Sequence, residues 1–469
     1  MANYKLRTLL AILALSLPSL SASEDITTKT LIASITQNHP KLLSLNATEQ
    51  QVTQGIQAAE GAFDIRVQQS TKLKISGFYD GNYLSQRLVK PLRFMGGRVI
   101  SEYRISDGTF ADYDGDYETR TGGEASVGIA LSLMRDRDTD SRRVAVSNAK
   151  LSVQRFNSQQ RLSINKLLYD GLSRYLDWYE TNLRLLVIAE LYETTKFREQ
   201  AIKSRIDKGL LAAITLTEFN TILLGRLTSF QDAQQRFIIS QQGLSFYYRD
   251  QNGNMIDTEK LSQSPDDILW PFSLSEQKIE QIKQQLISHP SMKIFYALVE
   301  QAKNDYNLSE NALLPQLDIE ARVARDLGSG DESLGMVDSE IGLTFSIPLG
   351  QQTAKAQKVI AQQKIQELSY ELQLVTDLLQ QDFEQSILRL NNAKQIAHNQ
   401  RQQAQIANKL FSQEKKRFDL GVSDLFLLNA RESSAIEAKL KAIGAEIAVF
   451  RQELATLFIA ANLDLPNSS

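Results

Sequence analysis

Side chains that could support chemistry are few in this chain of 469 residues. The densest group is DYDGDYE (Asp112–Glu118), which places four carboxylates at alternate positions, as calcium-binding loops do. An EF-hand loop needs glycine at its sixth position, whereas Gly115 is fourth, so we interpret the segment as a solvated anionic loop. The three histidines, His39, His289 and His398, show no metal-ligand spacing, and the chain has no cysteine. With no nucleophile elbow or phosphate-binding loop either, the sequence predicts no enzyme, no cofactor and no metal centre.

Two pairs of short segments repeat one another. RIDKG (Arg205–Gly209) and RFDLG (Arg417–Gly421) each close a very long stretch of helical pattern. SHP (Ser288–Pro290) echoes NHP (Asn38–Pro40), and each opens a helical stretch. Glycine tolerates the positive φ with which many helices end, so the first pair predicts two equivalent turns. The repeats indicate an internally duplicated chain.

The organisation that follows has four parts. Residues 1–23 read as a secretory signal, with Lys5 and Arg7 before the short apolar core Leu9–Leu17. The first structural repeat then covers 24–250, a linker covers 251–273, and the second repeat covers 274–469. No later segment has the 18 or so uninterrupted apolar residues of a membrane helix. The net charge of −3 gives no nucleic-acid footprint.

Alternating apolar and polar residues predict four strands, each about the length that crosses a bilayer when tilted. They lie at 63–75, 126–133, 317–323 and 341–347. Any one of them alone would also fit a soluble, half-buried sheet. Four strands cannot enclose a lumen, and open edges are not tolerated in lipid, so the barrel must be shared between copies around a rotation axis. We therefore expect an obligate homo-oligomer.

The first repeat carries an insert. Its histidine and arginine are 38 residues further apart than those of the second repeat, and the excess lies between Ile65 and Gly128. Within this excess, two strand-like runs, Tyr83–Arg93 and Arg98–Ser106, flank a tight turn at Phe94–Gly97. We interpret the insert, 84–118, as an extra hairpin that raises the subunit to six strands; a long surface loop is the alternative.

Two proline-free stretches, 141–208 and 353–417, predict helices of about 100 Å each. The second has a heptad seam, formed by Ala361, Ile365, Leu368, Leu372, Val375 and Leu379. The first has a similar stripe at Leu168, Leu172, Tyr175 and Tyr179. Shorter helices are expected at 29–59, 210–246, 274–313 and 424–463. Each repeat thus has a short helix, strands, a long helix and a second short helix.

This arrangement resembles the TolC-type outer membrane efflux family, also called outer membrane factors. The residues that carry the resemblance are KRFDLGVSDLFLLNAR (Lys416–Arg431), its counterpart SRIDKGLLAAITLTEFN (Ser204–Asn220), IPLG (Ile347–Gly350) and LMRDRDTDSRR (Leu133–Arg143). The resemblance covers essentially all of the chain after the signal. It implies an α+β membrane protein: a homotrimer with a shared antiparallel transmembrane β-barrel and a long periplasmic coiled-coil barrel of α-helices.

The resemblance also implies that the two glycine turns lie at the periplasmic tip, where the duct is gated and an adaptor docks. The residues expected there are Arg205, Asp207, Gly209, Arg417, Phe418, Asp419, Gly421, Ser423, Asp424, Phe426 and Asn429. Phe426 and Asn429 occupy the places where many family members carry acidic residues facing the lumen, so this chain departs from the family there. Asp424 and Glu432 are nearby carboxylates that could line the constriction instead. Arg205 and Arg417 could bridge helix pairs by charge-assisted hydrogen bonds, or act as solvated helix-end charges.

The function implied is a passive exit duct in the bacterial outer membrane, extending into the periplasm. Its partners would be outer-membrane lipid, a periplasmic adaptor (membrane fusion) protein and an inner-membrane pump of the RND, ABC or MFS type, with no nucleic acid. Drug efflux and type I protein secretion use the same family and are not separated by sequence. The alternative from another class is a trimeric outer-membrane stalk or adhesin without transport, which the internal duplication disfavours.

Overall fold

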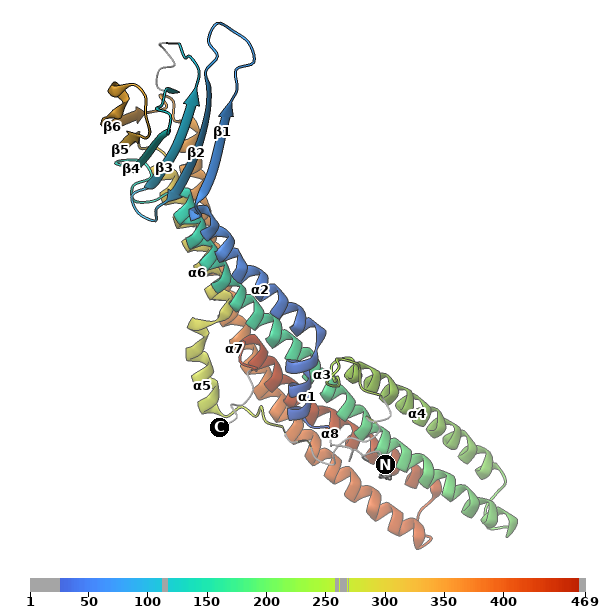
Figure 1. Ribbon diagram of the computed structural model, residues 1–469. Coiled ribbons are helices and arrows are strands. Elements are labelled where there is room, and N and C mark those ends of the chain that lie inside the picture. Colours follow the sequence, from blue (N-terminus) through green and yellow to red (C-terminus); the bar gives the residue numbers. More distant parts are fainter. Residues whose placement is uncertain (1–25, 112–116, 258–260, 262–267, 269, 464–469) are drawn as a thin grey trace, which may run out of the picture. The chain divides into compact units, whose positions relative to one another are not determined.

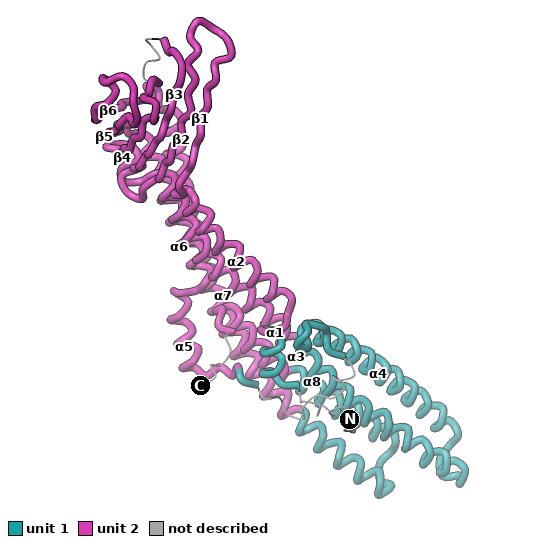
Figure 2. Tube along the Cα trace, in the orientation of Figure 1, with its two compact units in different colours: residues 1–35, 174–271, 404–444 teal, residues 36–173, 272–403, 445–469 magenta. Residues whose placement is uncertain are grey.

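The computed structural model describes residues 26–111, 117–257, 261, 268 and 270–463. The predicted signal segment and residues 112–116 of the acidic loop lie outside this part. The chain divides into two compact units (Figure 2): unit 1 comprises residues 1–35, 174–271 and 404–444, and unit 2 comprises 36–173, 272–403 and 445–469. Each unit therefore takes segments from both halves of the duplicated sequence.

Unit 2 contains one antiparallel sheet of six strands in sequence order (Figure 1). The strands are β1 (Arg66–Lys72), β2 (Asn82–Pro91), β3 (Arg98–Asp107), β4 (Glu124–Ser132), β5 (Gln316–Asp326) and β6 (Val337–Ser346). The four expected strands are present, and the insert forms β2 and β3, so the extra hairpin is confirmed. β1 is shorter than expected because Phe63 belongs to a 3₁₀ turn, η1 (Gly61–Phe63), where its buried ring lies under the guanidinium groups of Arg93 and Arg142.

The strand register gives the sheet two chemically different faces. One row of opposed residues runs through Arg66, Val89, Ile100, Gly128, Arg322 and Glu340. Because side chains alternate along a strand, this row and every second row from it form one face, which we call the polar face. It includes Gln68, Arg87, Glu102, Arg104, Glu124 and Asp338. The other face, the apolar face, includes Leu84, Val127, Ile129, Ile341, Leu343 and Phe345, and its charged residues, Lys90, Asp107 and Arg325, lie at or next to strand ends. Gln69 and Gln86 lie on it as well, and the amide of Gln86 donates to Gln69 at 3.2 Å.

The short helices that precede the strands in each repeat differ from those expected in one respect. The stretches 29–59 and 274–313 are each divided at the His-Pro pair, giving α1 (Thr28–Asn38), α2 (Pro40–Glu60), α5 (Glu276–Gln285) and α6 (Pro290–Asn311). Proline excludes the preceding residue from the helical region, and His39 is extended, with ψ 127°. The Nδ1 atoms of His39 and His289 each accept a backbone N–H two residues ahead, at 3.2 Å. Each histidine is therefore the N-cap of a new helix, α2 or α6.

The two long helices, α3 (Ser141–Asp207) and α7 (Gln352–Asp419), have almost the expected bounds. Both contribute to the two units, as do α1 and α8 (Leu425–Ile459), whereas α4 (Ile214–Ser245) lies in unit 1 alone. The predicted heptad seam of α7 is its least exposed stripe, with Ala361 and Leu368 buried and the other four members half-buried. None of the helices in the described residues has the length and apolarity that a membrane span requires.

Unit 1 has a mixed aromatic and aliphatic core. Trp178 and Tyr175 of α3 are fully buried. The indole N–H of Trp178 donates to the carbonyl oxygen of Leu261 at 2.9 Å, and the amide of Gln241 donates to the same oxygen at 3.0 Å. These bonds satisfy the buried polar groups and attach Leu261 to α3 and α4.

Candidate functional site

The two turns after α3 and α7 have the same backbone geometry. In the first, Gly209 has a φ of 71°, the N–H of Leu210 donates to the carbonyl of Arg205 at 2.9 Å, and that of Gly209 donates to Ile206 at 2.8 Å. In the second, Gly421 has a φ of 77°, and Val422 and Gly421 donate to Arg417 and Phe418, both at 3.0 Å. This pair of bonds defines a Schellman motif, whose left-handed position favours glycine. The repeated sequence R-x-D-x-G is therefore the signature of one helix ending used twice.

Side chains from the two turns meet within unit 1. The guanidinium of Arg205 lies 5.6 Å from the ring centre of Phe418, a cation–π distance. Arg417 pairs instead with Glu414 on its own helix, at 3.4 Å. The same buried carboxylate accepts the hydroxyl of Ser423, so Glu414 ties the second turn back onto α7. Sequence reasoning missed Glu414, because nothing in its spacing separates it from an exposed glutamate.

The remaining predicted site residues fall into two groups. Asp207, Asp419 and Phe426 are exposed, the phenyl ring of Phe426 at 83%. Asp424 caps α8, because its carboxylate accepts the N–H of Leu427 at 2.7 Å. Asn429 is buried and accepts a hydrogen bond from Arg198 at 3.1 Å. In one chain, therefore, Asn429 is held inside the helical unit, whereas Phe426 projects from it.

A buried charged cluster joins α3, α4 and α8 close to these turns. Glu432 is 3% exposed and its carboxylate accepts from Arg198 at 2.9 and 3.1 Å and from Arg226 at 2.7 Å. Arg226 also donates to the hydroxyl of Thr195. The burial of Glu432 and the engagement of both of its oxygens inside the unit argue against the possibility that it lines a constriction. The three helices come together only in the folded chain, so spacing along the sequence could not reveal the cluster.

The electrostatics of this cluster keep Glu432 ionised. Burial alone would raise the pKa of the carboxyl group. The hydrogen bonds and charge of Arg198, together with the charge of Arg226, outweigh that effect and hold the pKa of Glu432 below its usual value. One carboxylate thus serves two guanidinium groups, which makes it the central contact between three helices.

The polar face of the sheet in unit 2 carries a second charged network. Glu124, 4% exposed, accepts a hydrogen bond from Arg104 at 2.7 Å and another from Arg322. Arg322 also approaches Glu340 at 3.7 Å, so the network reaches β6. A network of ionised side chains that spans four strands suits a water-facing surface, and the opposite, apolar face suits hydrocarbon.

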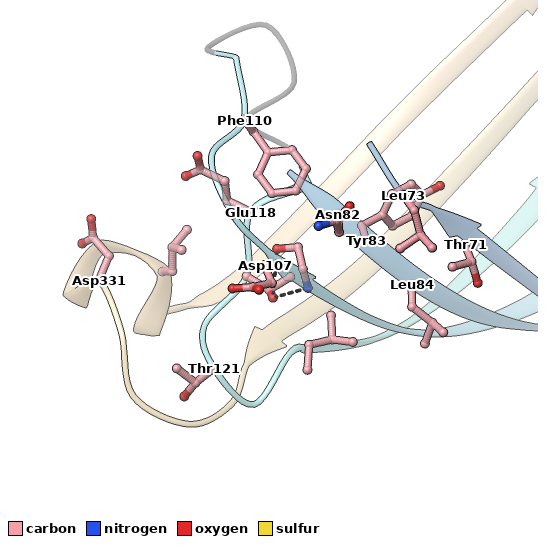
Figure 3. Close-up of a pocket in the computed structure, with 15 residues that line it drawn as sticks. Thr71, Leu73, Asn82, Tyr83, Leu84, Asp107, Phe110, Glu118, Thr121 and Asp331 are labelled. Carbon is pink, nitrogen blue, oxygen red and sulfur yellow. Dashed lines mark hydrogen bonds between the residues drawn. The ribbon is translucent and has the colours of Figure 1, made fainter. Parts of the chain in front are cut away.

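A cavity of about 770 Å³ lies at the end of the sheet away from the helices (Figure 3). Glu118 and Asp331 lie on one side of it, and Leu73 and Leu84 lie on the other. Asp331 accepts the N–H of Ser333 at 2.9 Å, and this bonding, assisted by the charge of Arg120, lowers its pKa. Within the described residues, no group of three or more histidine, aspartate or glutamate side chains could hold a metal ion.

The comparisons with known proteins agree with this geometry. Residues 281–455 match the family described as outer membrane efflux protein. The fold is similar to that of the outer-membrane channel OprN, with a TM-score of 0.66 at 12% identity over 94% of this chain and 91% of that one. It is also similar to the Campylobacter jejuni CmeC outer membrane channel (TM-score 0.64, 13% identity, 98% and 93%) and to VceC of Vibrio cholerae (0.64, 11%, 92% and 96%). No curated protein sequence matches the chain. The resemblance to the outer membrane efflux family is thereby confirmed over residues 281–455, and the fold over nearly the whole chain.

Proposed function

We propose that this chain is the outer-membrane exit duct of a tripartite efflux or type I secretion system and works as a homotrimer. The observation that carries the proposal is the sheet with one charged face and one apolar face, joined to very long helices, in a chain whose fold is that of outer-membrane channels. A six-stranded open sheet in lipid has two unpaired edges, which hydrocarbon does not tolerate. Closure with two further copies around a rotation axis removes them.

Transport through such a duct would be passive. The sequence has no phosphate-binding loop, so energy has to come from partners: a periplasmic adaptor protein and an inner-membrane pump of the RND, ABC or MFS type. The turns at Gly209 and Gly421 are the proposed docking end. Four apolar side chains near them are more than half exposed, which supports a protein partner there: Leu210, Leu420, Val422 and Phe426.

The same turns are the proposed gate, which opens when the helix pairs separate under adaptor contacts. Arg417 is suited to hold neighbouring helix pairs together, because its side chain is 58% exposed and its ion pair with Glu414 has a length of 3.4 Å. An exposed ion pair contributes at most about 1 kcal/mol, and a threefold ring would contain three of them.

Single-channel recording of the purified protein in a planar bilayer tests both proposals. The wild type should form a trimer sensitive to heat or SDS and conduct ions. Arg417→Ala should raise the mean conductance and increase antibiotic leakage into cells. Arg236→Ala, which removes an exposed arginine paired with Asp232 on α4, is the matched control and should conduct as the wild type does. If Arg417→Ala also conducts as the wild type does, Arg417 is a solvated helix-end charge and does not gate.

The competing function is a trimeric stalk or adhesin anchored by the strands. It also requires a closed trimer but no open lumen. A stable trimer that never conducts, in the wild type or with Arg417 replaced, would favour the stalk over the duct.

A further inference from the structure

The two outermost strands of the sheet, β1 and β6, carry opposite charge on the polar face. On β1 and its continuation this face presents Arg66, Lys72 and Lys74 and no carboxylate between 66 and 74. On β6 it presents Asp338 and Glu340 and no cation. Opposite charges directly across a strand pair stabilise it, and like charges destabilise it. Each open edge is therefore complementary to the other, and not to itself.

We propose that β6 of one copy pairs antiparallel with β1 of the next copy in a single register, with Ser346 opposite Arg66. This inference rests on the trimer proposed above. It specifies which residues meet where the sheets of two copies join, a junction that we call the seam. In this register Gly342 is opposite Ser70, Glu340 is opposite Lys72, and Asp338 is opposite Lys74. Two ion pairs then form between copies, both near the end of the sheet away from the helices.

The alternation of side chains excludes half of the other registers. A shift by one residue would turn the charged face of β6 onto the apolar face of β1, because side chains repeat with a period of two. In the proposed register the apolar faces also continue across the seam, with Phe345 opposite Val67. The nearest remaining alternatives are shifts by two residues in either direction.

The strand offset within one chain narrows those alternatives, because it sets the tilt of the strands in a closed barrel. The row that begins at Arg66, the first residue of β1, reaches β6 at Glu340, six residues before the strand ends at Ser346. Six residues are about 20 Å along a strand, and six strands are about 29 Å across, which corresponds to a tilt of about 35°. Transmembrane barrels have tilts of about 35–45°. In the proposed register, Ser346 of one copy lies opposite Arg66 of the next copy and the helices of both copies lie at the same height, so the strand tilt is within this range.

Registers shifted by two residues fit the strand tilt, the backbone hydrogen bonding or the charge pairing less well. Placing Thr344 opposite Arg66 lowers the tilt to about 25°, below the usual range. It also leaves Glu340 opposite the uncharged Ser70. Placing Pro348 opposite Arg66 gives a tilt of about 42°, which is also within the usual range, but it continues the pairing through a residue that has no N–H to donate. It leaves Asp338 opposite Ser76, without a cation.

Paired cysteines can read the register directly, because the chain has no cysteine of its own. Four exposed positions suffice: Gln68 and Ser70 on β1, and Gly342 and Thr344 on β6. A Cβ at Gly342 would meet no atom within 4 Å in this chain. The double variants Ser70→Cys with Gly342→Cys and Gln68→Cys with Thr344→Cys match the proposed register. The same cysteines exchanged, Gln68→Cys with Gly342→Cys and Ser70→Cys with Thr344→Cys, match the two shifted registers.

Each double variant is prepared as the full-length protein in detergent, treated with a short bis-methanethiosulfonate, and separated on a denaturing gel. The register predicts dimer and trimer bands that disappear on reduction, strong for the matched pairs and weak for the exchanged pairs. Stronger cross-linking of an exchanged pair, or cross-linking of no pair in protein that still migrates as a trimer before denaturation, overturns the register. Bilayer conductance of the same samples is measured separately. Conducting channels in which the matched pairs do not cross-link would contradict the proposed register but not the proposed transport function. A cross-linked trimer that does not conduct would contradict the transport function but not the register.

Charge exchange provides a second, independent measurement. Lys72→Glu should lower the temperature at which the trimer dissociates, because Glu340 of the neighbouring copy then faces a like charge. Adding Glu340→Lys to that variant should restore it. Additive losses in the double variant would contradict the pairing of these two residues.

Discussion

Replacing Glu432 with glutamine removes the carboxylate that two buried guanidinium groups share. Removing one partner of a buried ion pair costs about 3–5 kcal/mol, because the remaining charge stays desolvated. The lower end applies here, since glutamine keeps the shape and one acceptor, and the side chain of Arg198 is 15% exposed. We therefore expect a loss of about 3 kcal/mol in the local stability of the contact between α3, α4 and α8.

Amide hydrogen exchange measures this loss where it occurs. A local opening free energy lower by about 3 kcal/mol raises the exchange rate of protected amides about a hundredfold. The faster exchange should appear in peptides from 425–444 of α8 and from the facing part of α4. Peptides from the sheet in unit 2 should be unchanged.

The matched control is Glu437→Gln, five residues further along α8. Glu437 also forms an ion pair, with Lys441 at 2.7 Å, but both side chains are exposed, so its exchange pattern should stay close to that of the wild type. Acidification adds a second criterion. Because the pKa of Glu432 is lowered, the contribution of its carboxylate to the stability of the folded protein is complete above about pH 4.5. This contribution is lost as the pH falls through the pKa of Glu432 in the folded protein. Equal exchange in Glu432→Gln and Glu437→Gln would refute the role of the cluster.

Further predictions concern the helix turns and the histidine caps. Neither Gly209 nor Gly225 has an atom within 4 Å of a new Cβ, so only the backbone conformation distinguishes the two sites. Gly209→Ala should destabilise unit 1 by about 1–2 kcal/mol, because alanine is strained at positive φ. Gly225→Ala inside α4 should stabilise unit 1 by about 0.5–1 kcal/mol, because alanine is the better helix former. Chemical denaturation followed by circular dichroism should show opposite signs for the two changes. Burial lowers the pKa of His289, so its folded form is neutral and its stabilising contribution, complete above about pH 6.5, is lost as the pH falls below that value. His289→Asn keeps a capping acceptor and does not titrate, so its melting temperature should fall less between pH 7.5 and pH 5 than that of the wild type. An equal fall in both proteins would exclude His289 as the source.

Elements set by local periodicity could be predicted closely from the sequence. The bounds of α3 and α7 follow from the absence of proline and from the apolar stripes that become the buried seams. The hairpin β2–β3 follows from its alternation and from the glycines at Gly96 and Gly97. The expectation that the two His-Pro pairs open helices is confirmed at His39 and His289. The expected ranges 29–59 and 274–313 were wrong as single helices, because the residue before proline leaves the helix although the apolar pattern continues through it.

The contacts of the candidate site could not be predicted in the same way. Glu432 lies 234 residues from Arg198 along the chain, and only the packing of three helices brings them to 2.9 Å. An isolated glutamate or arginine in a helical pattern is usually solvated, and nothing in the local sequence distinguishes Glu432 or Arg198 from such a residue. The duplication was informative about the backbone, but it carries no information on which side chains pair across helices.

The two R-x-D-x-G turns share a backbone conformation but differ in the contacts of their arginine side chains. The Schellman motif uses the backbone carbonyl of the arginine, which any residue could supply, so the turn explains the glycine but not the arginine. The arginine side chains then act differently: Arg205 lies over the ring of Phe418, whereas Arg417 approaches Glu414. The first turn has Ile206 where the second has Phe418. Because isoleucine has no aromatic ring, Arg417 cannot make with Ile206 the cation–π contact that Arg205 makes with Phe418. Replacement of Arg417 therefore leaves the contact between the two turns of one chain in place, and an effect on conductance would report on contacts that Arg417 makes with a neighbouring copy or partner.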